Sequence, residues 1–555
     1  MAYTGNGAFG CLDARRAAAD GAIRDMGNMS LRFSPAISNR TARRNIKNGW
    51  TDFGGAYYGE RDFVVRGGKL YDGDTAVCSV SAGEKSMAVL ESKLYILPDK
   101  IEYDTANRTY KNYGYSLTNK DNSKRAWVGW GYTDQQVGDF IETTFNSEFL
   151  VLHGDDFPSF PFGKGELIYI DMETADGKKS MIYRVKPENI LLAYTEVGGI
   201  NANVWNIRFP VGTFADVAGN PSRSIISVKV TVRYDIPDMD GIFASDNRLW
   251  GYKGREIYCS ALGNGTEWSD YDTLATSSWA ATTKTGDDIT AGVDFGGTPV
   301  FFAENAAYKI YGENPKEFQY ARQDIIGVTK GDHKSVAVGA GYIFYLSRRG
   351  IYAWTGGVPQ LISAPLGEER ITDAVGGSDG AVYYLSCKQD GRQNLYVFDP
   401  MTFAWVREDD TEAVDIRLRG RDLCMVTRGG DVHLIGDVYD EIGTVEDGVR
   451  YYLETADYND GAVTQKSAKN ILIQHELAGG DADVCVSYDG EPWNHVYTLY
   501  DTDGKKITSV IPLREKRYRT MRIRIEGDGE IVIYYMMRDV APRTERTGGE
   551  KNVYQ

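Results

Sequence analysis

The sequence predicts an all-β protein: a β-propeller of about six blades (seven is possible), with an inserted β domain and a C-terminal β-sandwich. The chain of 555 residues contains 37 Tyr and 62 Gly, a composition that favours strands and tight turns over helices. Apolar strands recur along the chain at the spacing of propeller blades. After Val449, alternating polar and apolar residues with Gly/Asp turns are typical of a sandwich or jelly roll.

The blade repeat is clearest in the middle of the chain. Each unit holds an apolar strand, a Gly or charged turn, and a second strand that ends in an aromatic residue. The units start near Ile242, Thr290, Ser335, Ala381 and Ala413, so that successive starts lie 48, 45, 46 and 32 residues apart. A period of roughly 40 to 50 residues is that of a propeller, whose blades bury their faces on one another around an axis.

Changes in the residue pattern along the sequence also divide the chain into segments. Leu12–Asp20 is rich in good helix formers and predicts a helix. The blade rhythm is lost after residue 105 and returns after residue 236, which predicts an inserted barrel or sandwich. The predicted segments are a helix with an extended arm (1–60), the first blade or blades (61–105), the insertion (106–236), the remaining blades (237–447), the sandwich (448–541) and a polar tail (542–555).

The charge is unevenly distributed. The net charge is −16, yet residues 1–60 hold eight basic and five acidic residues, a net of +3, which leaves −19 for the remainder. An acidic surface argues against general nucleic-acid binding and is compatible with a wall past which DNA slides. The extended arm is either a loop strapped to its own domain or an arm that docks on an acidic neighbouring subunit, through the basic residues Arg40, Arg43, Arg44 and Lys47.

Known catalytic and metal-binding motifs are missing from the sequence. The five His residues include no HExxH pair, and there is no GxSxG elbow or phosphate-binding loop. The six Cys residues include no CxxC pair, which excludes the usual zinc spacings and a disulfide framework. Acidic turns at 235–241, 457–461 and 501–504 lack a complete calcium loop and are ordinary hairpin turns. The sequence therefore predicts no enzyme, no metal and no cofactor.

Tryptophans offer two readings. Those at strand ends in the repeats are expected to pack between blades, with stacking on sugars as the alternative: Trp250, Trp268, Trp354 and Trp405. In the insertion and the sandwich, three others are candidate platforms for a glycan: Trp127, Trp130 and Trp493. No run approaches the length of a transmembrane helix, and the N-terminus lacks the apolar core of a signal peptide.

In NRLWGYKGREIYCSALGNGTEW (Asn247–Trp268), a strand that reads Arg-hydrophobic-Trp precedes an I-Y-x-S-x-L-G motif and a turn that ends in Trp. This pattern resembles β-propeller tail proteins of bacteriophages, the tail hub or nozzle family of short-tailed phages and related tail-tip proteins. Met26–Arg44 resembles the N-terminal arm of that group, and Gly83–Thr105 its first blade. The C-terminal stretch that starts VCVSYDGEPW (Val484–Trp493) is similar to its closing sandwich. The insertion has no counterpart in the resemblance.

The resemblance implies a structural virion protein that is assembled in the host cytoplasm. Its relatives form a ring of six propellers around the DNA exit channel, with roles in tail assembly, DNA retention and ejection. The implied partners are further copies of the chain, adaptor or portal-side proteins, tail fibres, and genomic DNA passing without sequence-specific binding. A tail-tip protein that binds surface glycan is the alternative, and a propeller glycoside hydrolase is a third reading.

Overall fold

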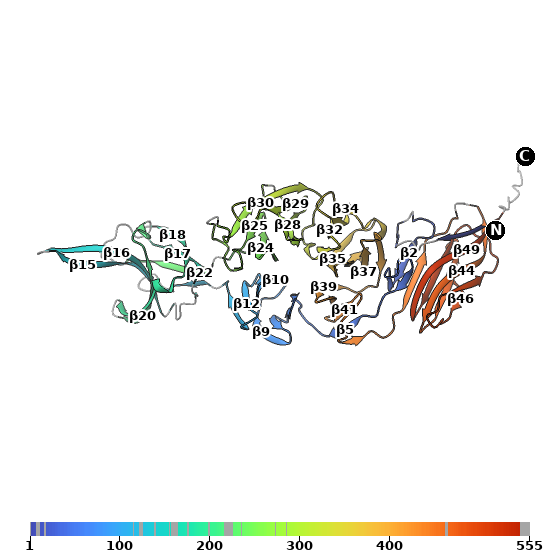
Figure 1. The fold of residues 1–555 in the computed structure, drawn as a ribbon, viewed down its shortest axis with the longest axis horizontal. Coiled ribbons are helices and arrows are strands. Elements are labelled where there is room, and N and C mark those ends of the chain that lie inside the picture. The colour runs from blue at the N-terminus through green and yellow to red at the C-terminus, as the bar shows by residue number, and fades with distance from the viewer. Residues whose placement is uncertain are drawn as a thin grey trace, which may run out of the picture. The chain divides into compact units, whose positions relative to one another are not determined.

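The computed structural model describes most of the chain as β-strands and turns (Figure 1). The structure describes residues 2–543 except 7–11, 16–17, 115, 121–125, 138–139, 155, 157–161, 163–164, 175–176, 198–199, 216–225, 235, 272–273, 285 and 461–463. The predicted polar tail therefore lies, from residue 544, outside the described residues. Short 3-10 turns occur at η1 (Pro187–Asn189), η2 (His333–Ser335) and η3 (Ala364–Leu366).

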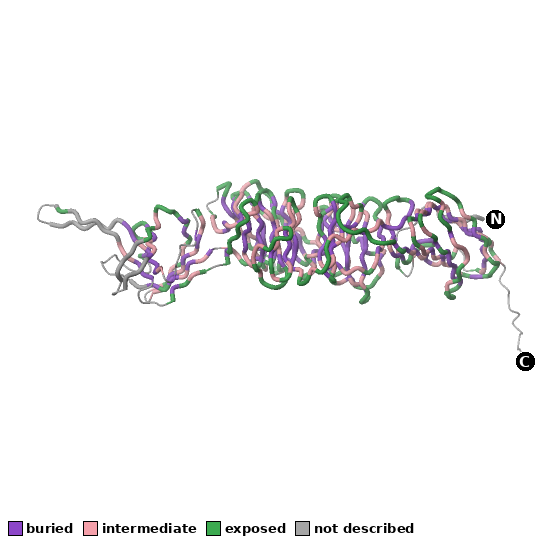
Figure 2. The backbone as a smooth tube through the Cα atoms, turned by 90° about the horizontal axis from the view of Figure 1, so that it is seen from below, coloured by how far each residue is buried: buried purple, intermediate pink, exposed green. Residues whose placement is uncertain are grey.

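The chain forms two compact units. Unit 1 comprises residues 1–84, 287–309 and 320–555, and unit 2 comprises residues 85–286 and 310–319. In both units the residues of the strands are mostly buried and those of the turns mostly exposed (Figure 2). Four-stranded antiparallel sheets of the blade type occur in both units, which confirms the predicted all-β propeller fold.

Six of the blade sheets are simple meanders of four consecutive strands. Their strands are β6 (Gly55–Tyr58), β7 (Asp62–Arg66), β8 (Lys69–Asp72), β9 (Thr75–Ser79); β10 (Ser86–Leu90), β11 (Lys93–Leu97), β12 (Ile101–Asp104), β13 (Thr109–Asn112); β23 (Gly241–Ser245), β24 (Arg248–Lys253), β25 (Glu256–Cys259), β26 (Trp279–Thr282); β27 (Ile289–Phe295), β28 (Thr298–Ala303), β29 (Ala306–Tyr311), β30 (Gln319–Asp324); β31 (Ala337–Gly339), β32 (Tyr342–Ser347), β33 (Gly350–Trp354), β34 (Gln360–Leu361); and β35 (Ile371–Ser378), β36 (Tyr383–Gln389), β37 (Arg392–Asp399), β38 (Ala404–Arg407).

The seventh blade sheet is completed by the N-terminal part of the chain. Strands β39 (Ala413–Arg419), β40 (Asp422–Thr427) and β41 (Val432–Ile435) are followed in the sheet by β5 (Arg44–Lys47) and the short β42 (Thr444–Val445). Within unit 1, β31 contacts β35, β35 contacts β39, and β39 contacts β6. Strands β35 and β39 approach closely at Gly377. A Cβ at this position would lie 2.6 Å from the carbonyl oxygen of Ile416, so the contact requires glycine.

The predicted sandwich is confirmed, and the N-terminal residues belong to it. One sheet has the order β3-β4-β49-β44-β47, with β1 also paired to β49, and the other has the order β2-β43-β48-β45-β46. The strands are β1 (Ala2–Asn6), β2 (Ile23–Gly27), β3 (Met29–Ser30), β4 (Ile37–Asn39), β43 (Tyr451–Thr455), β44 (Lys466–Ala478), β45 (Ala482–Tyr488), β46 (Asn494–Leu499), β47 (Ile507–Pro512), β48 (Met521–Gly527) and β49 (Glu530–Pro542). Buried side chains such as Ile23, Met26 and Ile37 join its core.

The predicted helix over Leu12–Asp20 is wrong, because no described residue of that segment is helical. Leu12 is buried and pairs with Ile23 in a parallel bridge. The backbone N–H of Leu12 donates to Trp405 and that of Ala14 donates to Pro365. An isolated helix of this length is marginal in water, so burial of Leu12 and these contacts override the local propensity.

The insertion forms two sheets in unit 2, as the sequence predicts for an inserted β domain. Its sheets have the orders β14-β22-β17-β18 and β19-β20-β16-β15-β21. The strands are β14 (Ser116–Thr118), β15 (Ala126–Val137), β16 (Phe140–His153), β17 (Leu167–Glu173), β18 (Lys178–Arg184), β19 (Ile190–Val197), β20 (Ile200–Phe209), β21 (Ile226–Ser227) and β22 (Lys229–Tyr234). Residues such as Val128, Leu150 and Val232 form a core shared by both sheets.

Candidate functional site

The N-terminal arm, here residues 37–47, joins two modules of unit 1. At one end β4 pairs with β49 of the sandwich, with Ile37 opposite Ile533. At the other end β5 pairs with β41 of the seventh blade sheet, with Arg44 opposite Leu434. The arm is therefore held at both ends by strand pairing within its own chain.

Two predicted arm residues lie buried between these ends. Arg40 Nη1 is 2.7 Å from Glu446 Oε2, and its Nη2 donates to Glu446 Oε1 at 2.9 Å. Arg43 Nη2 is 2.7 Å from Glu408 Oε2, and its Nη1 is 2.8 Å from Asp409 Oδ2. The side chains of Arg40, Arg43 and Glu408 are 5%, 8% and 6% exposed. These five residues are called the arm cluster.

The electrostatics of the arm cluster favour the charged forms. Burial raises the pKa of Glu446, but the hydrogen bond and charge of Arg40 outweigh it and hold that pKa below its usual range. Burial also opposes ionisation of Asp409, and the charge of Arg43 together with backbone donation from Thr411 lowers its pKa. Burial opposes the charge of Arg43 as well, yet Glu408 and Asp409 raise its pKa above the ordinary value. The cluster is thus a set of mutually dependent buried charges.

The other two predicted arm residues lie at the surface. Arg44 Nη1 donates to the carbonyl oxygen of Glu441 at 3.0 Å. Lys47 Nζ is 2.9 Å from Asp74, a pair whose side chains are 47% and 78% exposed. All four predicted residues therefore contact groups of their own chain, and docking on a neighbouring subunit stays a prediction.

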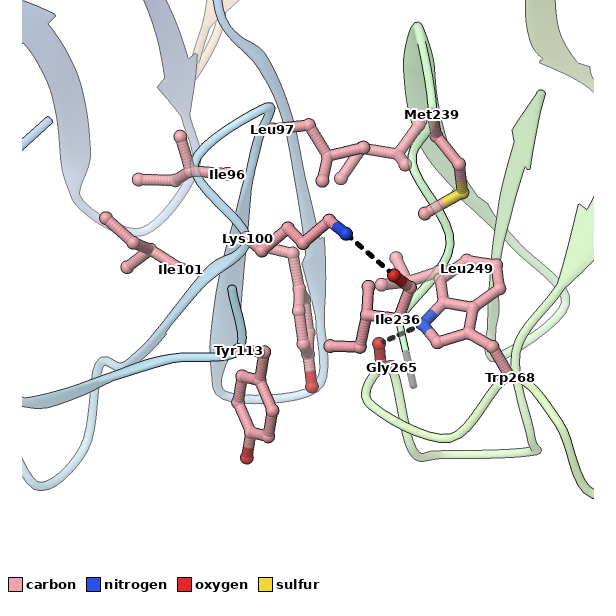
Figure 3. Close-up of a pocket in the computed structure, with 12 residues that line it drawn as sticks. Ile96, Leu97, Lys100, Ile101, Tyr113, Ile236, Met239, Leu249, Gly265 and Trp268 are labelled. Atoms are coloured by element: carbon pink, nitrogen blue, oxygen red, sulfur yellow. Dashed lines mark hydrogen bonds between the residues drawn. The ribbon is translucent and has the colours of Figure 1, made fainter. Parts of the chain in front are cut away.

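The joint between insertion and blade sheets in unit 2 is apolar. Tyr113 and Ile236, at the two ends of the insertion, line a small pocket together with Leu97, Met239 and Trp268 (Figure 3). Lys100 Nζ donates to the carbonyl oxygen of Ile236 at 2.8 Å, and Trp268 Nε1 donates to that of Gly265 at 2.8 Å (Figure 3). The pocket volume of about 20 Å³ is close to the space of one water molecule. The joint is packed too tightly to hold a larger ligand.

The predicted tryptophan platforms differ in exposure. Trp127 is 5% exposed and packs with Val151 and Val204. Trp130 is half-buried, and its Nε1 is buried without a partner among the described residues. Trp493 is half-buried on the sandwich, where the guanidinium carbon of Arg522 lies 5.0 Å from its ring centroid. Of the three, Trp493 is partly exposed at the position directly before β46 of the sandwich.

The tryptophans of the blade sheets lie in the core, as the packing alternative predicts. Their exposed fractions are 2% for Trp250, 2% for Trp268, 1% for Trp354 and 0% for Trp405. Trp405 Nε1 donates to the carbonyl oxygen of Ile362 at 2.7 Å, which satisfies its one polar atom. The rings of Trp250, Trp354 and Trp405 make edge-to-face or tilted contacts with other aromatic rings in the core.

The described part of the chain holds neither a metal-ligating cluster nor a membrane-spanning helix. Within it, no group of three or more His, Cys, Asp or Glu side chains has the arrangement of a metal site. Among the same residues, no helix has both the length and the apolar character needed to cross a membrane.

No protein-family model and no curated protein sequence matches this chain. Among solved structures it is similar to the computationally designed Ika8 protein, with 8% identity over 71% of this chain and 99% of that chain and a TM-score of 0.33. It is also similar to BamB from Moraxella catarrhalis, with 9% identity, coverage of 73% and 99%, and a TM-score of 0.32. An exo-beta-1,3-galactanase from Phanerochaete chrysosporium shares 9% identity, with coverage of 54% and 95% and a TM-score of 0.21. Likenesses at this level assign neither a family nor an activity to the chain.

Proposed function

We propose that this chain is a structural protein of a bacteriophage tail, which forms an oligomeric ring, a nozzle or hub, around the DNA exit channel. The observation that carries the proposal is the construction of unit 1. The arm ends in strands of two different modules. Between these ends Arg40 is buried against Glu446, which precedes the sandwich, and Arg43 is buried against Glu408, which lies between two blade sheets. A component under DNA pressure needs modules that do not separate, and this strapping supports that use.

Charge supports the same role. The net charge of −16 gives a wall that repels DNA phosphates, so that DNA passes without adhering. In this proposal the ring contributes to tail assembly, DNA retention and ejection, and its neighbours are adaptor or portal-side proteins and tail fibres. The protein acts in the virion after assembly in the host cytoplasm.

Mass and shape of the purified protein test the proposal. Light scattering and negative-stain microscopy are expected to show a ring of about six copies with a central hole. A monomer that also fails to form a ring when mixed with the other tail proteins of its phage would contradict the proposal.

Glycan recognition by the sandwich is the second candidate. It is favoured by Trp493, which lies half-buried beside Arg522, directly before the edge strand β46, since aromatic rings beside polar groups stack on sugars. A glycan array with the full chain and with Trp493→Ala is expected to show hits that the variant loses. An array without hits for the full chain would dismiss this candidate.

A further inference from the structure

An acidic groove opens on the sandwich of unit 1. Its volume is about 540 Å³, within the range of roughly 300–1,000 Å³ that suits a sizeable ligand or side-chain group. It lies where β43, β48 and β45 run side by side, with Tyr452 opposite Glu526 and Glu526 opposite Asp483. The lining residues are Arg450, Tyr451, Tyr452, Asp481, Asp483, Glu526, Gly527 and Asp528.

The groove carries an excess of negative charge. Four carboxylates and one guanidinium line it. Asp483 Oδ1 accepts from Thr498 and contacts His495, and Glu526 pairs with Arg524. The Asp481 carboxylate has no hydrogen-bond or ion-pair partner among the described residues. The groove thus selects a positively charged group that also covers an aromatic floor.

A cationic and aromatic turn protrudes from the same sandwich. Arg32 and Phe33 lie between β3 and β4, and the guanidinium carbon of Arg32 is 4.7 Å from the Phe33 ring centroid. Phe33 is 48% exposed, and Arg32 is exposed with no carboxylate partner in the part of the chain that is described. Ser34 N–H donates to Leu31 at 2.8 Å and Ala36 N–H donates to Phe33 at 2.9 Å, which fixes the turn. Pre-organised arginine and aromatic side chains are typical interface anchors.

The turn and the groove lie in different layers. The turn joins strands of the sheet β3-β4-β49-β44-β47, whereas the groove belongs to β2-β43-β48-β45-β46. No hydrogen bond or ion pair joins Arg32 to a groove carboxylate within the described residues. A contact between two such unlike surfaces is heterologous, and it forms a ring when the rotation that it repeats closes on itself.

We propose that copies of this chain associate through their sandwiches, with the Arg32–Phe33 turn of one copy seated in the acidic groove of the next. This inference rests on the proposed ring and names one of its contacts. Arg32 would lie between the groove carboxylates, with Asp481 as the carboxylate left free for it. Phe33 would pack at the edge of the Tyr452 ring, beside Arg524, whose guanidinium carbon lies 5.2 Å from the centroid of that ring.

Charge exchange tests the contact in the full chain. Arg32→Asp and Asp481→Arg are each expected to weaken self-association about tenfold or more, because each places like charges together. The chain that carries both changes is expected to recover most of the wild-type association. Arg392→Asp, which removes an exposed guanidinium at the first residue of β37, is the matched control and is expected to associate as the wild type does. Sedimentation equilibrium over a concentration series measures the self-association of the wild type and of the four variants.

The outcomes separate the contact from the proposed function. A wild-type ring that survives Arg32→Asp unchanged would overturn the contact and leave the ring proposal standing. Weakening by Arg32→Asp without rescue in the double variant would show that the turn docks elsewhere, on another tail protein or another face, and would overturn the groove as its receptor. A wild-type chain that stays monomeric at every concentration would overturn the contact and count against the ring as well.

Discussion

Replacing Arg43 by Ala removes one of the two buried cations of the arm cluster. The side chain is 8% exposed, and its two carboxylate partners Glu408 and Asp409 are 6% and 20% exposed. The substitution removes two ion pairs at 2.7 and 2.8 Å and the donation to Thr411 Oγ1 at 3.0 Å. It leaves two carboxylates buried with one cation fewer.

The magnitude follows from the uncompensated charge. Removing one partner of a buried pair costs about 3–5 kcal/mol. Arg40 Nε remains 3.8 Å from Glu408 and offsets part of that cost, so that the free energy of unfolding of unit 1 is expected to fall by about 3 kcal/mol. A loss of that size lowers the melting temperature of the affected transition by about 6–12 °C.

Calorimetry and urea denaturation of the full chain measure this loss. Arg44→Ala is the control, since Arg44 donates to one surface carbonyl, and its effect is expected to stay within about 0.5 kcal/mol. Arg43→Met combined with Glu408→Leu and Asp409→Asn is expected to regain most of the stability, because no buried charge is left unpaired. An Arg43→Ala protein as stable as the wild type would refute the reasoning that the cluster holds the arm.

Four further predictions concern the pH dependence of stability, the topology and thiol reactivity. His475 is fully buried, its Nε2 has no partner among the described residues, and burial lowers its pKa. Because the unfolded chain then binds a proton at this position more readily than the folded chain, the free energy of unfolding is expected to fall as the pH drops below about 6.5. Urea titrations of His475→Phe over the same pH range should show a smaller fall. The arm-cluster carboxylates Asp409 and Glu446 have lowered pKa values in the folded chain. Their contribution to stability is therefore present above about pH 4 and is lost as the pH falls through the folded-state pKa values. The Asp409→Asn variant is expected to lose less stability than the wild type between about pH 4 and about pH 2. Deleting residues 1–47 removes β1–β5 and is expected to expose both sandwich sheets. Limited proteolysis should then cleave the chain rapidly after residue 447. The control is a chain shortened only by its tail from residue 544, and it is expected to stay resistant. Among the described cysteines, half-buried Cys78 is expected to react first with a thiol reagent, because burial raises the pKa of Cys259, Cys387 and Cys424 to about 12 each.

Features encoded by local periodicity could be predicted from the sequence. The blade units near Ile242, Thr290 and Ala381 are sheets whose strands follow one another along the chain. Hairpin-connected strands leave a repeat in the sequence, and so do aromatic residues that fill each core. Trp354 and Trp405 are buried for that reason.

Features that depend on distant pairing could not be predicted. Strand β5 is four residues, RNIK, of which no more than one is apolar, so no period marks it as the closing strand of a blade. The four arm cations were visible as a basic cluster in an acidic chain, but their partners were not. Arg43 and Glu408 are separated by 365 residues, and Arg40 and Glu446 by 406, and no local rule connects such positions.

The same distant pairing has a consequence for folding. Asn39 donates to the carbonyl oxygen of Gly529, 490 residues away, and accepts from the N–H of Ile531. Neither sandwich sheet is therefore complete until β2 has paired with β43 and β4 has paired with β49. Closing loops of this length carries an entropic cost that is recovered only when the core forms. Pairing of β4 with β49 also fixes one end of the arm, whose other end completes the seventh blade sheet through β5. If neighbouring copies associate through the sandwich, we expect the Arg32–Phe33 turn to be in place only after β4 has paired with β49.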